Sequence, residues 1–171
     1  MHAMVHHRFG RASEVLTLED VETPEPAAGQ VLVRIEASSA NPYDWHVIRA
    51  EPWFMRAGFA GVRTPKRPIP GGDLAGVIEA VGAGDVGGFE VGDEVYGFSH
   101  GSFAEYIAVD HDSIARKPDG LTWEEAASLP LAAATALQGL KEVGGIAPGQ
   151  QVLIIGASGG IGSLAVQMAV A

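Results

Sequence analysis

The feature that most constrains the fold is a glycine-rich run near the end of the chain. Residues 151–155 read QVLII, residues 156–162 read GASGGIG, and residues 163–169 read SLAVQMA. An unalternating apolar run bounded by glycines is typical of a strand buried on both faces of a parallel sheet. The order of strand, glycine turn and apolar helix therefore predicts one βα unit of an α/β domain.

The glycines of this turn have the spacing that a bound dinucleotide requires. We expect Gly156 to allow the tight turn, Gly159 to let the backbone approach a pyrophosphate, and Gly162 to let the helix pack closely on the strand. The helix N-terminus would supply N–H donors and the positive end of a dipole. The alternative is a turn without a ligand. The predicted cofactor-binding residues of the turn are Gly156, Ala157, Ser158, Gly159, Gly160, Ile161 and Gly162.

The preceding sequence has a different character. From Val5 to about Pro118, short β-branched segments alternate with glycine and proline turns, which predicts a β-rich, barrel-like unit. One helix is expected over 42–49, with Asn41 as its N-cap and Pro42 in its first position. Residues 51–70, with four prolines, are expected to form an irregular loop. The predicted strands are 31–35, 74–81, 94–98, 103–109 and 113–115.

The β-rich pattern ends near Gly120. Residues 122–125 read TWEE, a helix-capping signature, and a second helix is expected from near Ala132 to just before Gly144. The sequence therefore predicts a domain boundary here. The two domains would span residues 1–121 and 122–171.

Composition excludes several classes of partner. The formal net charge of −10 argues against nucleic acid and against a membrane surface, because both require a basic face. Arg63, Lys66 and Arg67 are the tightest basic cluster, and two roles are open for it: a solvated loop, or a contact to phosphate or substrate. The N-terminus has no apolar segment typical of a secretion signal, so a cytoplasmic protein is expected.

Residues suited to redox or metal chemistry are sparse. The chain has no cysteine, which excludes a disulfide, a thiol nucleophile and a cysteine-ligated zinc site. Its six histidines show no helical i, i+4 pair and no partnered carboxylate at ligand spacing. No metal site is therefore expected.

The complete pattern resembles the medium-chain dehydrogenase/reductase superfamily, in its zinc-independent quinone oxidoreductase (zeta-crystallin-like) branch. The resemblance implies a β-rich GroES-like catalytic domain followed by the first βα unit of a Rossmann domain. It covers nearly the whole chain, which would correspond to the N-terminal half of such a protein. The match rests on five stretches: NPYD at 41–44, PGGDLAGVI at 70–78, GDEVYG at 92–97, GSFAEY at 101–106, and the block 149–167.

The resemblance also implies an activity. Such enzymes transfer a hydride from NADPH or NADH to a quinone or an α,β-unsaturated carbonyl, and the cofactor supplies the chemistry. The zinc-dependent branch carries a cysteine near Asn41 and a His-Glu pair near Gly72, both absent here. Two departures leave substrate preference open. Val170 stands in place of a basic residue, and His46 stands where relatives often carry a tyrosine.

Site residues follow from the same resemblance, each with an alternative. Asn41 would lie near the nicotinamide ribose, or only cap its helix. Thr135 would face the nicotinamide, or only bond its own helix backbone. His46 would donate a proton to the reduced substrate, or only pack on the short helix. Four aromatic residues could either form the wall of a substrate pocket or pack in the core, and the sequence favours neither role: Tyr43, Trp45, Trp53 and Phe54.

A non-enzymatic reading remains open beside this one. The chain would then be a catalytically incompetent GroES-like fragment that only folds or binds a partner chain. The residue that selects NAD or NADP lies about 20 residues beyond the glycine motif, so cofactor preference stays open. An unpaired strand at 152–155 would expose its edges. We therefore expect either self-association through this Rossmann stub or docking of the C-terminal segment on the β-rich domain.

Overall fold

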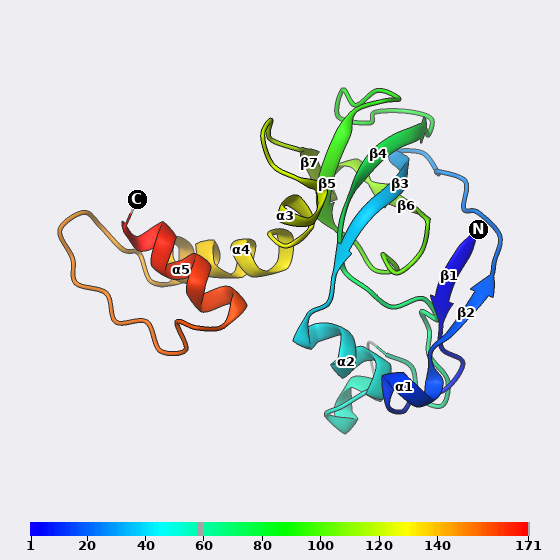
Figure 1. The fold of residues 1–171 in the computed structure, drawn as a ribbon, viewed down its shortest axis with the longest axis horizontal. Coiled ribbons are helices and arrows are strands. Elements are labelled where there is room, and N and C mark those ends of the chain that lie inside the picture. The colour runs from blue at the N-terminus through cyan, green and yellow to red at the C-terminus, as the bar shows by residue number, and fades with distance from the viewer. Residues whose placement is uncertain (58–59, 171) are drawn as a thin grey trace.

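The computed structural model describes residues 1–57 and 60–170; Gly58 and Phe59 of the predicted loop, and Ala171, lie outside the described residues. Among these residues, five strands form an antiparallel sheet in the order β6-β3-β4-β5-β7 (Figure 1). Two more strands, β1 and β2, pair with each other. The bounds are β1 His2–Val5, β2 Thr17–Asp20, β3 Gln30–Ser39, β4 Asp73–Val81, β5 Glu94–Phe98, β6 Tyr106–Asp110 and β7 Ile114–Arg116.

One face of the larger sheet carries the main apolar core. Val31 and Val33 alternate along β3 with less buried residues, as expected of a strand with one buried face. Fully burying such a side chain contributes roughly 1.5–3 kcal/mol. The buried members of the cluster are Val31, Val33, Leu74, Ile78, Val95, Ile107 and Val109.

The five strands predicted for the β-rich part are confirmed, with shifts at their ends. The bounds of β5 are those predicted, whereas β6 begins at Tyr106 and not at Phe103. Before β6, Ala104 forms only an isolated bridge with Ala3, and the Phe103 carbonyl accepts a hydrogen bond from Met4. The two sheets therefore adjoin along this segment without forming a continuous ladder.

Helices α2 and α3 each begin directly after the capping residue that the sequence indicates. Helix α2 spans Pro42–Arg49 as predicted, and the Asn41 backbone N–H donates to Asp44 Oδ2 at 2.6 Å. Helix α3, Trp123–Ala127, begins after Thr122, whose Oγ1 accepts from the Glu125 backbone N–H. These local hydrogen bonds satisfy donors that a helix leaves unpaired at its start. The short helices are α1 Ala12–Val15, η1 Trp53–Ala57 and η2 His111–Ser113.

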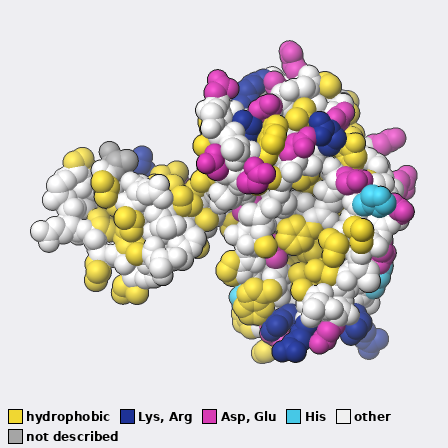
Figure 2. All heavy atoms as spheres, viewed as in Figure 1, with side chains coloured by type: hydrophobic (Ala, Val, Ile, Leu, Met, Phe, Trp, Pro, Cys, Tyr) yellow, Lys and Arg dark blue, Asp and Glu magenta, His cyan; other side chains and the backbone are white. Residues whose placement is uncertain are grey.

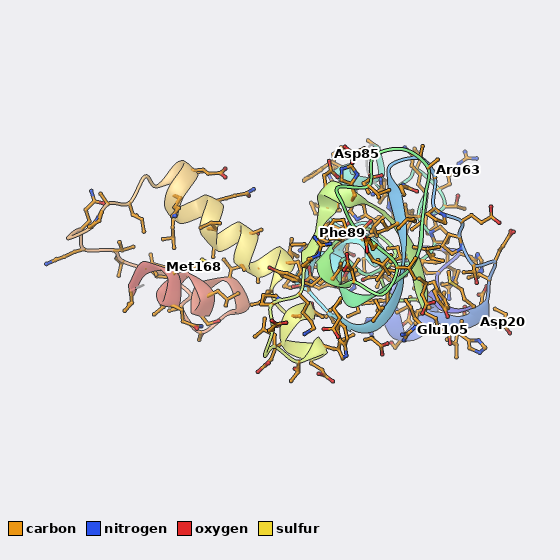
Figure 3. The ribbon with its side chains drawn as sticks, turned by 90° about the horizontal axis from the view of Figure 1, so that it is seen from above. Asp20, Arg63, Asp85, Phe89, Glu105 and Met168 are labelled. Carbon is orange, nitrogen blue, oxygen red and sulfur yellow. The ribbon has the colours of Figure 1, made fainter. Side chains whose placement is uncertain are left out.

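Two longer helices form the C-terminal part. Helix α4 spans Pro130–Leu137 and continues as the π-helix η3, Gln138–Val143, which confirms the second predicted helix. Helix α5 spans Gly160–Val170 and packs beside α4, away from the sheets (Figures 1 and 3).

The predicted strand at 151–155 is wrong in this structure. Residues 151–154 have no regular secondary structure and a turn begins at Ile155. The side chains of Leu153 and Ile155 are 87% and 90% exposed. A strand is held by hydrogen bonds to its neighbours, and the described residues place no strand beside this segment. The apolar pattern is typical of a buried strand, but the described residues provide no neighbouring strand to pair with it.

Charge and apolar surface are unequally divided. In Figure 2, yellow side chains lie among uncharged atoms on the α4–α5 part, while acidic and basic side chains gather on the β-rich part. After Glu125, Lys141 and Glu142 are the charged residues of the sequence. Within the described residues, no helix has the length and apolar character needed to cross a membrane.

Candidate functional site

A cleft of about 540 Å³ separates the start of α2 from the α4–α5 pair. Its walls come from three segments far apart in the sequence: the start of α2, one face of α4, and the turn that leads into α5. Ala157 and Ser158 belong to this turn without lining the cleft, and His46 lies outside it. The predicted site residues that line the cleft are Asn41, Thr135, Gly156, Gly159, Gly160, Ile161 and Gly162.

The glycines of the turn have different steric surroundings. Gly156 has a φ of +81°, a conformation that side chains with a Cβ rarely adopt. A Cβ on Gly162 would overlap the Gly156 carbonyl oxygen, so this glycine is required by the turn itself. A Cβ on Gly159 would lie 3.5 Å from that oxygen, and one on Gly160 would meet nothing within 4 Å. The chain alone therefore gives no steric reason for glycine at 159 and 160.

The first turn of α5 faces the same cleft. The Gly159 N–H donates to the Gly156 carbonyl, and the Ser163 N–H donates to the Gly159 carbonyl. The N–H groups of Gly160, Ile161 and Gly162 lie in the first turn of α5, where the helix itself provides no acceptor for them. Such N–H groups, with the positive end of the helix dipole, bind phosphate without a charged side chain. The bare backbone at 159 and 160 thus fits a pyrophosphate.

Asn41 holds the opposite wall through a hydrogen-bond triangle. Its Nδ2 donates to Ser39 Oγ at 3.1 Å and to Asp73 Oδ2 at 2.9 Å, and Ser39 Oγ donates to the same Asp73 oxygen at 2.8 Å. A carboxylate accepts hydrogen bonds, which fixes the amide nitrogen toward Asp73. The remaining hydrogen-bonding atom of the amide is therefore Oδ1, an acceptor that suits a ribose hydroxyl.

Asp73 also reaches the second wall. Its Oδ1 accepts from the Leu131 backbone N–H at 2.9 Å, in the first turn of α4. The Asp73 side chain is fully buried, and both of its oxygens have partners. One carboxylate thus joins the Asn41 side of the cleft to the start of α4.

Thr135 lies on the exposed face of α4 toward the cleft. Its hydroxyl donates to the Leu131 carbonyl at 2.7 Å, so the backbone bond foreseen as the alternative role is present. The donor is used, but the oxygen still accepts. An acceptor at this position fits the amide nitrogen of a nicotinamide.

His46 lies on α2 but does not line the cleft. Its Nδ1 lies 2.7 Å from the Glu51 carbonyl, and its ring stacks on Trp45 with 3.7 Å between ring centroids. Trp53 and Phe54 are 78% and 60% exposed. Of the four aromatic residues considered for a pocket wall, Tyr43 lines the cleft.

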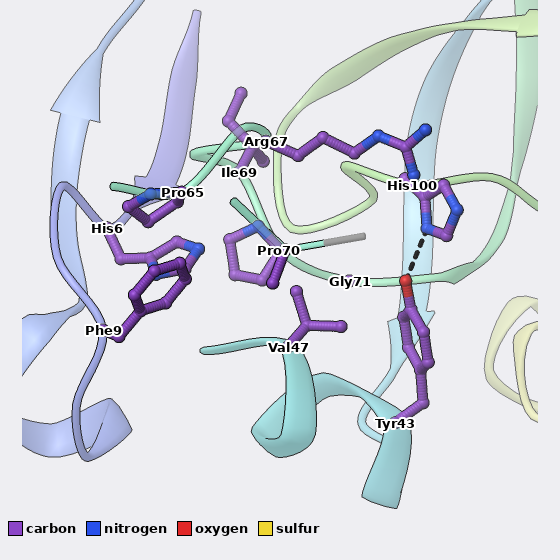
Figure 4. Close-up of a pocket in the computed structure, with 11 residues that line it drawn as sticks. His6, Phe9, Tyr43, Val47, Pro65, Arg67, Ile69, Pro70, Gly71 and His100 are labelled. Atoms are coloured by element: carbon purple, nitrogen blue, oxygen red, sulfur yellow. Dashed lines mark hydrogen bonds between the residues drawn. The ribbon is translucent and has the colours of Figure 1, made fainter. Parts of the chain in front are cut away.

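Tyr43 connects the cleft with a small inner cavity of about 10 Å³ (Figure 4). The Tyr43 hydroxyl lies 2.7 Å from His100 Nδ1. Burial raises the pKa of Tyr43 to about 12, although the positive charge of Arg67 opposes this rise. Burial, with a smaller contribution from Arg67, lowers the pKa of His100. Both groups are therefore kept neutral near pH 7.

Asp44 is a second buried carboxyl beside the site. Burial raises its pKa, and the neighbouring Asp73 contributes in the same direction, while the hydrogen bond from the Asn41 backbone opposes the rise. Its Oδ1 is buried without a hydrogen-bond partner. The helix start therefore carries an acidic residue whose charge is disfavoured by its surroundings.

Sequence reasoning missed the roles of Asp73 and His100. A single carboxylate between Gly71-Gly72 and the apolar run LAGVI is a signal for Asp73, because an acidic residue within a buried strand needs partners. No sequence signal pairs His100 with Tyr43, since the two are 57 positions apart. Across the residues that the structure describes, no group of three His, Asp or Glu side chains suits a metal ion.

Comparison with known proteins agrees with this architecture. Residues 27–119 match the alcohol dehydrogenase GroES-like domain. The chain is 41% identical over 168 residues to 2-methylene-furan-3-one reductase of Solanum lycopersicum, which covers 91% of this chain and 41% of that protein. The quinone oxidoreductase structure from Coxiella burnetii is 33% identical with a TM-score of 0.84, covering 99% of this chain and 53% of that one.

A third similar protein was solved with a cofactor. Mycobacterial Rv1454c, in complex with NADPH, is 31% identical with a TM-score of 0.84 and covers 99% of this chain and 50% of that one. The chain thus spans about half the length of the proteins that it matches. With the GroES-like match, the curated relative and these structural neighbours, the chain belongs to the medium-chain dehydrogenase/reductase superfamily, in its quinone oxidoreductase (zeta-crystallin-like) branch.

Proposed function

We propose that the full-length protein binds NADPH or NADH in the cleft and reduces a quinone or an α,β-unsaturated carbonyl without zinc. The observation that carries this proposal is the meeting of Asn41, Thr135 and the glycine turn around one cleft. Three segments distant in the sequence supply hydrogen-bonding groups that fit three parts of one dinucleotide. The relative solved with NADPH supports the choice of cofactor.

Each wall would hold a different part of the cofactor. The N–H groups at the start of α5 would bind the pyrophosphate, Asn41 Oδ1 would accept from a ribose hydroxyl, and Thr135 Oγ1 would accept from the nicotinamide amide. The cofactor, when bound, supplies the hydride. The protein would fix the position of the nicotinamide relative to the substrate.

His46 remains our proposed proton donor to the reduced substrate. Its Nδ1–H donates to the Glu51 carbonyl, so the transferred proton would leave from Nε2 of the doubly protonated ring. In the described structure His46 does not line the cleft, and this role requires that the substrate extend past the start of α2.

The organisation of the protein is also proposed. We place the boundary between a GroES-like domain, 1–121, and a Rossmann domain, 122–171, at the Thr122 cap, because the last strand of the main sheet ends at Arg116. The lack of cysteine fits a cytoplasmic location.

The second candidate function is that of a fragment without turnover, which binds another copy or a partner chain. The exposed apolar side chains of Leu153 and Ile155 favour it. Such side chains are buried in a complete parallel sheet.

Turnover by the full-length protein tests the proposal. We expect NADPH or NADH oxidation, followed at 340 nm, in the presence of a quinone or an enone, with a rate unchanged by EDTA or added zinc. A protein that loses activity to the chelator and regains it with zinc would refute zinc independence. A protein with no turnover on either acceptor class would favour the fragment.

A further inference from the structure

We propose that Asp73 is a positioning residue that sets both walls of the cofactor cleft. This inference rests on the proposed function, because it assigns Asp73 a role in cofactor binding. Asp73 does not line the cleft. It would act through Asn41 on one wall and through the start of α4 on the other.

The partners of Asp73 are divided between its two oxygens. Oδ2 receives Ser39 Oγ and Asn41 Nδ2, whereas Oδ1 receives the Leu131 backbone N–H. The Asn41 bond spans 32 positions in sequence and the Leu131 bond spans 58. A single carboxylate therefore fixes the distance between two segments that local structure leaves independent.

The Asn41 bond decides which atom the cleft receives. Both hydrogens of Asn41 Nδ2 are used by Ser39 and Asp73, so rotation of the amide would break both bonds and leave a half-buried donor unpaired. This keeps the acceptor Oδ1 available for a ribose hydroxyl. Without the carboxylate, either the oxygen or the nitrogen of the amide could turn toward the cleft.

The Leu131 bond decides where α4 begins. Pro130 is the first residue of the helix, and Leu131 supplies the next backbone N–H. A buried carboxylate at this position satisfies an unpaired donor and interacts favourably with the helix dipole. Because Thr135 lies one turn further along α4, a shift of the helix start moves its hydroxyl with it.

Asp73→Asn tests the role, because an amide has one accepting atom where the carboxylate has two. Either the Asn41 bond or the Leu131 bond to this side chain must then be lost. We expect the Kd of the full-length protein for NADPH to rise about tenfold, since small displacements of positioning groups have effects of this order or larger. The KM for NADPH should rise more than kcat falls, because the chemistry itself is untouched.

A double-mutant cycle separates positioning from general destabilisation. In an Asn41→Ala background, Asp73→Asn should raise Kd only about threefold or less, because only the α4 bond remains to be lost. Equal effects in both backgrounds would overturn the positioning role. Ser102→Ala is the matched control, since Ser102 is fully buried beside this network, bonds Ser38, and lines no part of the cleft. It should lower the thermal midpoint and leave Kd unchanged.

Ser39→Ala provides the same test if Asp73→Asn fails to fold. It removes one donor to Oδ2 but leaves the carboxylate in place. We expect Kd to rise about threefold in the wild-type background and not at all with Asn41→Ala; equal effects would again overturn the role. A wild-type protein that binds neither NADPH nor NADH would refute the proposed function itself, and the positioning role with it.

Discussion

Gly159→Val should raise the Kd of the full-length protein for NADPH about a hundredfold with little loss of stability. An added Cβ meets only the Gly156 carbonyl oxygen, at 3.5 Å, so the chain accommodates it. A bound pyrophosphate would meet the new side chain and lose charge-assisted hydrogen bonds worth about 1.5–3 kcal/mol each. About 2.7 kcal/mol corresponds to a hundredfold change in Kd. Isothermal calorimetry gives Kd, and thermal unfolding gives the stability.

Two variants calibrate this result. Gly139→Val adds the same side chain where nothing lies within 4 Å and away from the cleft, and should leave Kd unchanged. Gly162→Ala should lower both affinity and stability, because its Cβ would overlap the Gly156 carbonyl. An unchanged Kd in Gly159→Val would mean that the turn serves the fold alone.

Replacing Leu153 and Ile155 together by Asp should abolish self-association of the 171-residue chain. These side chains are 87% and 90% exposed, and burying each between two copies would contribute roughly 1.5–3 kcal/mol. A charge at such a contact costs more than the contact gains, so the dimer dissociation constant should rise at least about a hundredfold. Sedimentation velocity over a concentration series measures this shift.

Val91→Asp is the control for this experiment, because Val91 is 62% exposed and lies just before β5, outside the C-terminal part. It should leave the association unchanged. A wild-type chain that stays monomeric at every concentration would contradict the predicted role of the exposed segment.

Local signals explain which elements could be predicted from the sequence. The start of α2 depends on Asn41, Pro42 and Asp44, which are adjacent, and its predicted bounds match the structure. The capping box at Thr122 likewise involves residues within four positions. A strand is different, because its hydrogen bonds come from elsewhere in the chain. The segment 151–155 has the composition of a buried strand, yet it forms none without neighbours.

The candidate site shows the same division. The glycine turn could be located from its spacing, and Gly156 has the positive φ expected of it. The Asp73 bonds to Asn41 and Leu131 could not be predicted, because they join residues 32 and 58 positions apart. Which donors surround a buried carboxylate depends on the tertiary fold, and no periodicity in the sequence encodes it.

Hydrogen–deuterium exchange of the full-length protein with and without NADPH tests the cofactor cleft most directly. Binding across the cleft should slow exchange in three separate segments: the start of α2, the first turns of α4, and residues 156–163. The sheet β3-β4-β5 should exchange equally in both states. Protection confined to one of these segments, or found only outside the cleft, would contradict a dinucleotide held between Asn41, Thr135 and the glycine turn.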